Sequence, residues 1–148
     1  MVRTLGVLAG IAAGCGERVD EGCLDDAAFF RERVWPEVVQ PTCMACHTAE
    51  GAARASGLVF ANPARPDHWE VDRAALADVG GLEREGVSLL LRKPLGEDGH
   101  GGGAVLEEGS EAFGLLRSFV ARLEEPVRCP EREAAGEEGA LELMGTAP

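Results

Sequence analysis

Three residues in one short run, Cys43, Cys46 and His47, are the side chains in this sequence best suited to chemistry. The two cysteines are three residues apart, so one helical turn places both thiols on the same side of the backbone. From there they can add across the two vinyl groups of a haem, and the adjacent imidazole can then bind the iron. The run Cys-Met-Ala-Cys-His therefore predicts one covalent haem c, with His47 as its proximal ligand.

Two other uses of this run remain as alternatives. A zinc knuckle usually adds a second Cys or His pair at short spacing, and none follows His47. A thioredoxin-like dithiol normally lies in a strand–helix–strand unit, and no such pattern surrounds Cys43. Both alternatives fit the surrounding sequence less well than haem attachment does.

His100 is the expected distal iron ligand. It lies far along the chain from His47, in a segment where Gly99 and the glycines at 101–103 would let the backbone lie flat against a porphyrin. A glycine turn with a solvated His100 is the alternative. The other candidates are less well placed, inside the attachment turn, at the start of a helix or in the C-terminal tail: Met44, His68 and Met144.

Several other side chains are candidate haem contacts. Arg92 and Lys93, with Arg54, could pair with the propionates, because a buried carboxylate without a partner is costly; solvated surface charge is the alternative. Trp35 is expected in the core or the haem-pocket wall. The segment 100–103 resembles the oxyanion loop of lipases, but no Gly-x-Ser-x-Gly nucleophile motif accompanies it. We therefore expect no enzymatic activity.

The helix before the haem run is expected to span about residues 25–40. Asp25 and Asp26 suit a helix N-terminus, where negative charge is favourable. Pro36 is expected to end or kink this helix near Trp35, since proline lacks the backbone donor. Its buried stripe is predicted from four-residue spacing at Phe30, Val34 and Val38.

The rest of the domain is predicted to be helices and loops. A second helix is expected from Asp67 or His68 to Val79, with a buried face at Val71, Ala75 and Val79. Residues 88–91 can make about one turn, and the segments 48–66 and 95–109 read as loops. Ser110 should cap a last helix, and no alternating strand pattern occurs, so the fold class is predicted all-α. The apolar stripe of that last helix is Phe113, Leu116, Phe119, Val120 and Leu123.

One domain is predicted between an export segment and an acidic tail. Residues 1–14 have the layout of a signal peptide, and "IAAGC" resembles a bacterial lipobox ending at Cys15. Cleavage at another small residue, leaving Cys15 free, is the alternative. We expect a tether at 15–22, the domain at 23–129 and a disordered acidic tail or linker at 130–148.

Charge and cysteine number limit the partners and the compartment. The formal charge of −12 excludes electrostatic nucleic-acid binding and favours basic partners. Five cysteines are an odd count for an exported protein. One assignment leaves no free thiol: two on haem, Cys15 on lipid, and a disulfide between Cys23 and Cys129.

Together, the runs "FFRERVWPEVVQPTCMACH" and "LLLRKPLGEDGHGGG" resemble class I-like monohaem c-type cytochromes, and in particular cytochrome-c-like domains of bacterial envelope proteins. The resemblance covers roughly residues 25–125. It implies a small all-α domain around one haem and single-electron transfer between redox partner proteins, and its packing would bring the first and last helices, hence Cys23 and Cys129, together. One departure is that no Met occupies the distal loop.

Cys15 is predicted to be the lipidated N-terminus of the mature protein, because it ends a short apolar run of small residues and otherwise leaves an unpaired exported thiol. Mass spectrometry of the protein from the envelope fraction should find a diacylglyceryl-modified N-terminal Cys15. A soluble mature protein that begins elsewhere and carries unmodified Cys15 would contradict this.

Overall fold

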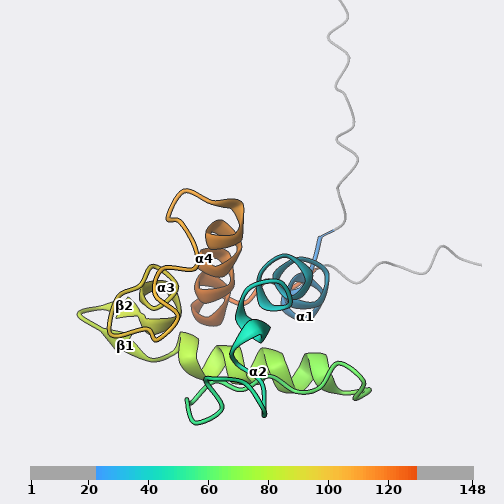
Figure 1. Cartoon of the computed structure of the whole chain (residues 1–148). Coiled ribbons are helices and arrows are strands. Elements are labelled where there is room, and N and C mark those ends of the chain that lie inside the picture. The colour runs from blue at the N-terminus through green and yellow to red at the C-terminus, as the bar shows by residue number, and fades with distance from the viewer. Residues whose placement is uncertain (1–22, 130–148) are drawn as a thin grey trace, which may run out of the picture.

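The computed structural model, which describes residues 23–129, consists of helices joined by long loops, with one small hairpin (Figure 1). The export segment, the tether with Cys15, and the tail with Met144 lie outside the described residues. Between residues 23 and 129 no helix has the length and apolarity to cross a membrane. The elements are α1 (Asp26–Phe29), the π-helix η1 (Phe30–Val39), the 3₁₀ turn η2 (Cys43–Ala45), α2 (His68–Gly80), β1 (Glu83–Arg84), β2 (Val87–Ser88), α3 (Leu89–Arg92) and α4 (Glu111–Glu124).

The mostly helical class agrees with the prediction, and one small hairpin does not. Strands β1 and β2 pair antiparallel, with Glu83 opposite Ser88 and Arg84 opposite Val87. Glu85 and Gly86 make the turn with positive φ of 55° and 76°. Two-residue strands are too short to produce an alternating pattern, so the sequence carried no signal for them.

The helix before Cys43 does not end at Pro36, which corrects the expected end near Trp35. Asp25 caps α1 by accepting a hydrogen bond from the Ala28 amide at 2.8 Å, and the chain continues directly into η1. In η1 the turns are wider, and at its end the Gln40 amide donates to the Trp35 carbonyl five residues back. A π-helical turn accommodates a proline that would interrupt an α-helical ladder.

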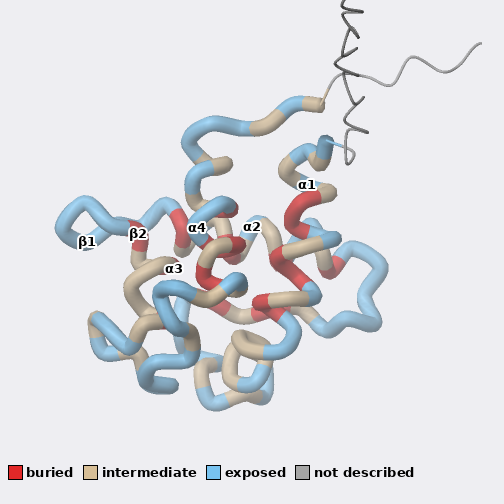
Figure 2. Tube along the Cα trace, turned by 90° about the horizontal axis from the view of Figure 1, so that it is seen from above, coloured by how far each residue is buried: buried red, intermediate tan, exposed pale blue. Residues whose placement is uncertain are grey.

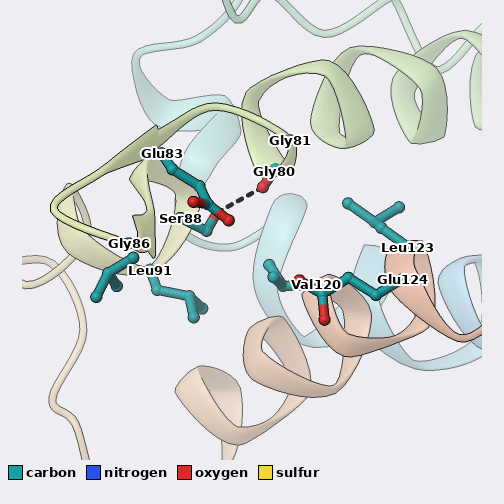
Figure 3. Close-up of a pocket in the computed structure, with 10 residues that line it drawn as sticks. Gly80, Gly81, Glu83, Gly86, Ser88, Leu91, Val120, Leu123 and Glu124 are labelled. Atoms are coloured by element: carbon teal, nitrogen blue, oxygen red, sulfur yellow. Dashed lines mark hydrogen bonds between the residues drawn. The ribbon is translucent and has the colours of Figure 1, made fainter.

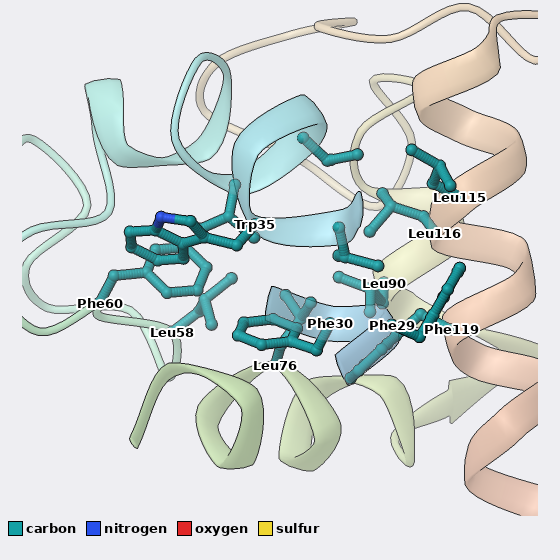
Figure 4. Close-up of a cluster of buried hydrophobic side chains, with 13 residues drawn as sticks. Phe29, Phe30, Trp35, Leu58, Phe60, Leu76, Leu90, Leu115, Leu116 and Phe119 are labelled. Carbon is teal, nitrogen blue, oxygen red and sulfur yellow. The ribbon is translucent and has the colours of Figure 1, made fainter. Parts of the chain in front are cut away.

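The apolar core lies where η1, α2, α3 and α4 meet (Figure 4). Phe30 packs on Phe119 of α4 with ring centres 5.9 Å apart, and Leu58 and Phe60 of the long loop close the other side. Ser110 caps α4 as predicted, accepting from the Phe113 amide. In Figure 2 the buried positions gather on the inner sides of these helices. Burying each large apolar side chain contributes about 1.5–3 kcal/mol to stability.

The buried face of α2 differs from the predicted one. Val71 is 37% exposed, whereas the buried residues are His68, Asp72, Leu76 and Gly80. This stripe includes two titratable side chains, so an apolar pattern could not reveal it. His68, at the start of this helix, is covered by Trp35 and Trp69 at ring distances of 5.3 and 4.2 Å.

The two ends of the domain are joined to each other. Cys23 and Cys129 form a disulfide, the pairing expected from the cysteine assignment. Beside it, Arg122 of α4 donates to the Leu24 carbonyl at 2.9 Å and its guanidinium lies 4.0 Å from the Phe29 ring centre. The Val127 amide donates to the Asp26 carboxylate at 3.2 Å. The segment before α1 is thus fixed to the segment after α4.

Asp72 is predicted to lower stability as pH rises. Its buried carboxylate accepts the Ala61 amide at 2.6 Å, while the other oxygen is buried without a partner. Burial raises its pKa, against the effects of the Ala61 hydrogen bond, His68 and Arg65. When the pKa of a group is higher in the folded than in the unfolded state, the group stabilises the fold at low pH. For an aspartate this stabilisation is complete below the unfolded pKa of about 3.9, and it is lost as the pH rises through the folded pKa.

Asp72→Asn keeps the acceptor for Ala61 and cannot ionise, so its free energy of unfolding should rise relative to that of the natural protein between pH 3 and 7. Urea unfolding across that range measures the difference. Asp78→Asn, at an exposed site on the same helix, is the control. A difference between the Asp72 variant and the natural protein that stays constant with pH would contradict the prediction.

Candidate functional site

A cavity of about 660 Å³ lies between the Cys-Met-Ala-Cys-His run and the loop that carries His100. Cys43, Cys46 and His47 line one side, and His100 lines another. Small-molecule and cofactor sites are typically concave, mostly apolar and about 300–1,000 Å³ in volume. The remaining wall is largely apolar, including Leu58, Val79, Leu89, Leu90, Leu106 and Leu116.

The attachment run is a tight turn fixed by its own backbone. The amides of Cys46 and His47 both donate to the Cys43 carbonyl, at 3.2 and 3.0 Å. The Ala53 amide donates to the Cys46 carbonyl at 2.9 Å, so the chain folds back over the turn. A Cβ at Gly51 would overlap that same carbonyl, so only glycine fits there. The turn presents both side chains, Cys43 and Cys46, to the cavity.

Both cysteines at the cavity are free thiols in the structure. Burial raises the pKa of the Cys43 thiol to about 11, so it is neutral at pH 7. Cysteines of redox dithiols have lowered pKa values, because the thiolate is their nucleophile. The environment of Cys43 therefore has the opposite character from a thioredoxin-like site.

His47 is oriented by the loop that follows it. Its Nδ1 lies 2.9 Å from the Leu58 carbonyl and 3.3 Å from Ser56 Oγ. A carbonyl oxygen only accepts, so Nδ1 carries the proton and Nε2 keeps a free lone pair. Ligating histidines are typically fixed by this kind of second hydrogen bond. None of the described residues makes a hydrogen bond to His47 Nε2.

His100 shows the same arrangement on its own loop. Its Nδ1 lies 2.7 Å from the Gly103 carbonyl, so Nδ1 is again the donor. Nε2 of His100 is likewise without a partner among residues 23–129. Each of the two imidazoles at the cavity therefore offers an unprotonated Nε2, which is the form that binds a metal.

The two imidazole rings lie near each other at the cavity with almost parallel planes. Their centres are 6.2 Å apart and their planes differ by 10°. Two imidazoles whose Nε2 atoms point at one metal ion from opposite sides would have ring centres about 6 Å apart, given bonds of about 2 Å and a ring radius of about 1 Å on each side. The donor set, two imidazoles with two thiols beside them, suits a haem iron with axial nitrogen ligands.

The other predicted contacts are only partly at the cavity. Lys93 lines it, and its Nζ donates to the Asp98 carbonyl at 3.0 Å. Arg54 and Arg92 are not among its lining residues. The Arg92 guanidinium pairs instead with three carboxylates, so its expected role with the propionates is not supported by this geometry. These carboxylates are Asp98 at 2.5 Å, Glu97 at 3.2 Å and Glu85 at 3.5 Å.

Trp35 belongs to the core, which was one of its two expected positions, and does not line the cavity. It is 6% exposed and packs on Phe60 with ring centres 6.4 Å apart. Phe60 in turn lies 6.4 Å from the His47 ring. Trp35 therefore supports the cavity wall from behind. Met44 and His68 are not among the lining residues either.

The groups that orient the two histidines were missed by sequence reasoning. They are mainly backbone carbonyls, of Leu58 and Gly103, which leave no mark in the residue types. Ser56 and Asp98 were also missed, although Asp followed by Gly is a common turn signal. Within residues 23–129 no group of three or more His, Cys, Asp or Glu gathers to hold a metal ion.

Comparisons with known proteins do not assign this chain to a family. The functional interpretation therefore depends on the geometry of the cavity and on its thiol and imidazole groups. No protein-family model, no curated protein and no solved structure matches the chain.

Proposed function

We propose that this protein is a monohaem c-type cytochrome with a class I-like helical domain, which carries single electrons at the bacterial cell envelope. The observation that carries the proposal is the placement of two Nδ1-protonated imidazoles, His47 and His100, at one apolar cavity that Cys43 and Cys46 also line. The proposed reaction forms and breaks no bond in a substrate.

The chain's own residues would hold and tune the cofactor. A bound haem would supply a reversible one-electron couple at iron. Cys43 and Cys46 would fix its edge by thioether bonds, and the Leu58 and Gly103 carbonyls would keep both imidazoles in the ligating tautomer. Two nitrogen ligands hold the potential below that of a His/Met pair.

The wall of the cavity and its rim have separate roles in this proposal. Apolar side chains such as Leu90 and Leu116, which are buried in the core and reach the cavity, would exclude water from the iron. Lys93 is the cationic side chain placed to meet a propionate, since it lines the cavity. Excluding water lowers the local dielectric and favours the less charged oxidation state.

The partners and the location are proposed from the whole sequence. A formal charge of −12 favours redox partners with basic docking surfaces. The export segment and Cys15 favour a protein anchored by lipid at the periplasmic face of the envelope or at the cell surface. The negative charge disfavours nucleic acid.

Two other functions would be separated from this one by simple measurements. A haem-based sensor or peroxidase-like module would have an open or labile sixth site, and the glycine-rich loop that carries His100 is the one observation in its favour. A haem-free interaction lipoprotein, stapled by the Cys23–Cys129 disulfide or by zinc, would not take up haem covalently.

Covalent haem attachment is the first test. The protein expressed with a c-type maturation system should stain for haem after denaturing electrophoresis, because thioether bonds survive the gel. Cys43→Ser with Cys46→Ser should abolish the stain, and Met44→Leu, which keeps the spacing, should not. An unstained natural protein would overturn the proposed function.

His100 is predicted to be the sixth ligand. His100→Ala should keep the covalent haem but bind carbon monoxide readily in the reduced state, because its iron lacks the second nitrogen ligand. Absorption spectra before and after adding the gas measure this. His68→Ala is the control and should remain low-spin. An unchanged low-spin spectrum in His100→Ala would show that another residue fills the sixth position.

A further inference from the structure

The largely buried carboxylate of Asp98 holds the loop that carries His100. The Asp98 side chain is 8% exposed and receives two guanidinium groups. Arg92 Nε donates to Oδ2 at 2.5 Å, and Arg84 Nη1 donates to Oδ1 at 2.9 Å. The Asp98 backbone carbonyl accepts from Lys93 Nζ at 3.0 Å. Asp98 is thus bound through three polar atoms to three cations.

At its start the loop is tied to α3, because the Gly96 and Glu97 amides donate to the Lys93 and Arg92 carbonyls at 2.9 and 3.3 Å, and beyond Asp98 most of its bonds are internal. It begins and ends at the bridge between Leu95 and Ala104, and Gly96, Gly99 and Gly103 all have positive φ. An added Cβ at Gly99 would meet nothing within 4 Å. The hydrogen bonds of His100 itself go to Glu97 and Gly103 of the same loop. Those bonds shape the loop but do not set its place against the cavity.

The cations that hold Asp98 belong to a rigid framework. Arg92 ends α3, and Arg84 lies in the β1–β2 hairpin. This hairpin is tied to the end of α2, because Ser88 Oγ donates to the Gly80 carbonyl at 2.8 Å (Figure 3). The Leu89 amide also donates to the Leu82 carbonyl at 2.7 Å. Arg84 and Arg92 therefore give Asp98 fixed points of attachment.

We propose that Asp98 is the positioning residue of the distal ligand: its bonds to Arg92 and Arg84 hold His100 at the cavity and so keep the sixth iron position closed. Charge-assisted bonds of a poorly exposed carboxylate to two guanidinium groups are among the stronger polar interactions in proteins. Loss of these bonds would free the loop, so that His100 could leave the cavity although it is still present in the sequence. The inference rests on the proposed haem function.

In this role Asp98 decides whether the sixth iron position is filled, which a residue that only stabilises the loop would not do. With the loop held, both axial positions are filled by protein nitrogen and the site suits electron transfer. With the loop released, the same cofactor has a position open to an external ligand. Asp98 thereby selects between a carrier and a ligand-binding site without touching the iron.

The test compares variants of the mature holoprotein by the rate of carbon monoxide binding to the reduced iron. Asp98→Asn keeps a residue that tolerates positive φ, which is 53° here, and removes the charge. It should bind the gas at least about tenfold faster than the natural protein. Losing a hydrogen bond to a charged group changes an equilibrium constant by about that factor. The rate in His100→Ala sets the fully open limit.

Glu97→Gln is the matched control. Glu97 is the neighbouring carboxylate and also pairs with Arg92, at 3.2 Å, but its side chain is 47% exposed. Its removal should change the rate by less than about twofold, as for other exposed ion pairs. The midpoint potential should follow the same order, rising in Asp98→Asn and unchanged in Glu97→Gln.

Arg84→Gln tests the link to the hairpin. The Arg84 side chain is 62% exposed, so Arg84→Gln should fold normally. It therefore tests the same contact if Asp98→Asn does not fold or take up haem. It should speed gas binding several-fold, and Arg84→Gln with Asp98→Asn should be no faster than Asp98→Asn alone, because both act through one contact.

Each failure has a separate meaning. If Asp98→Asn and Arg84→Gln both match Glu97→Gln while His100→Ala opens the iron, Asp98 does not position the ligand and the inference is wrong. If His100→Ala also stays closed, His100 is not the ligand, and the inference falls with that assignment. A natural protein without covalent haem overturns the proposed function and the inference together.

Discussion

The packing of η1 against α4 is the interaction on which the rest of the structure depends. Phe30 meets Phe119 across this contact, and Val34, Val38 and Leu116 are fully buried around it. The turn at Cys43–Ala45 begins a few residues after η1 ends at Val39, so its position is set by how η1 lies on α4. Leu116 reaches through to the cavity wall. The contact between η1 and α4 thus positions both the two thiols and the part of the cavity wall that Leu116 forms.

A cavity in so small a domain has an energetic meaning. Apolar side chains that face open space lose the contacts that packing would give them, and residual volume in a core costs stability. The sequence has few aromatic residues and no tyrosine with which to fill such a space. A large apolar cofactor would supply the missing contacts, so haem would serve as part of the core as well as its redox centre.

The sequence predicted the parts of the fold that depend on apolar spacing or on strong local signals. Ser110 and the stripe beyond it specified α4, and the cysteine assignment specified the pair Cys23 and Cys129. Pro36 was misread because a local rule about α-helices does not anticipate a π-helix. Val71 was misread because the buried stripe of α2 contains His68 and Asp72, whose burial only tertiary contacts can reveal.

At the cavity, the sequence predicted which residues line it but not which groups orient them. Cys43, Cys46, His47 and His100 were found from spacing and elimination, and all four line one space. Their orientation depends on backbone carbonyls, which every residue has, and on Asp98, whose partners come from an unexpected hairpin. The pairing of Arg92 with Asp98 also could not be foreseen, because a cation's partner is chosen by the fold.

The Cys23–Cys129 disulfide has a mechanical consequence. It covalently connects the points where the chain enters and leaves the domain, across a sequence separation of 106 residues. A pull on the flanking segments would run from one end to the other through the sulfur–sulfur bond. The helices and loops between these cysteines would bear none of that load, so the cavity and both imidazoles would keep their geometry under tension.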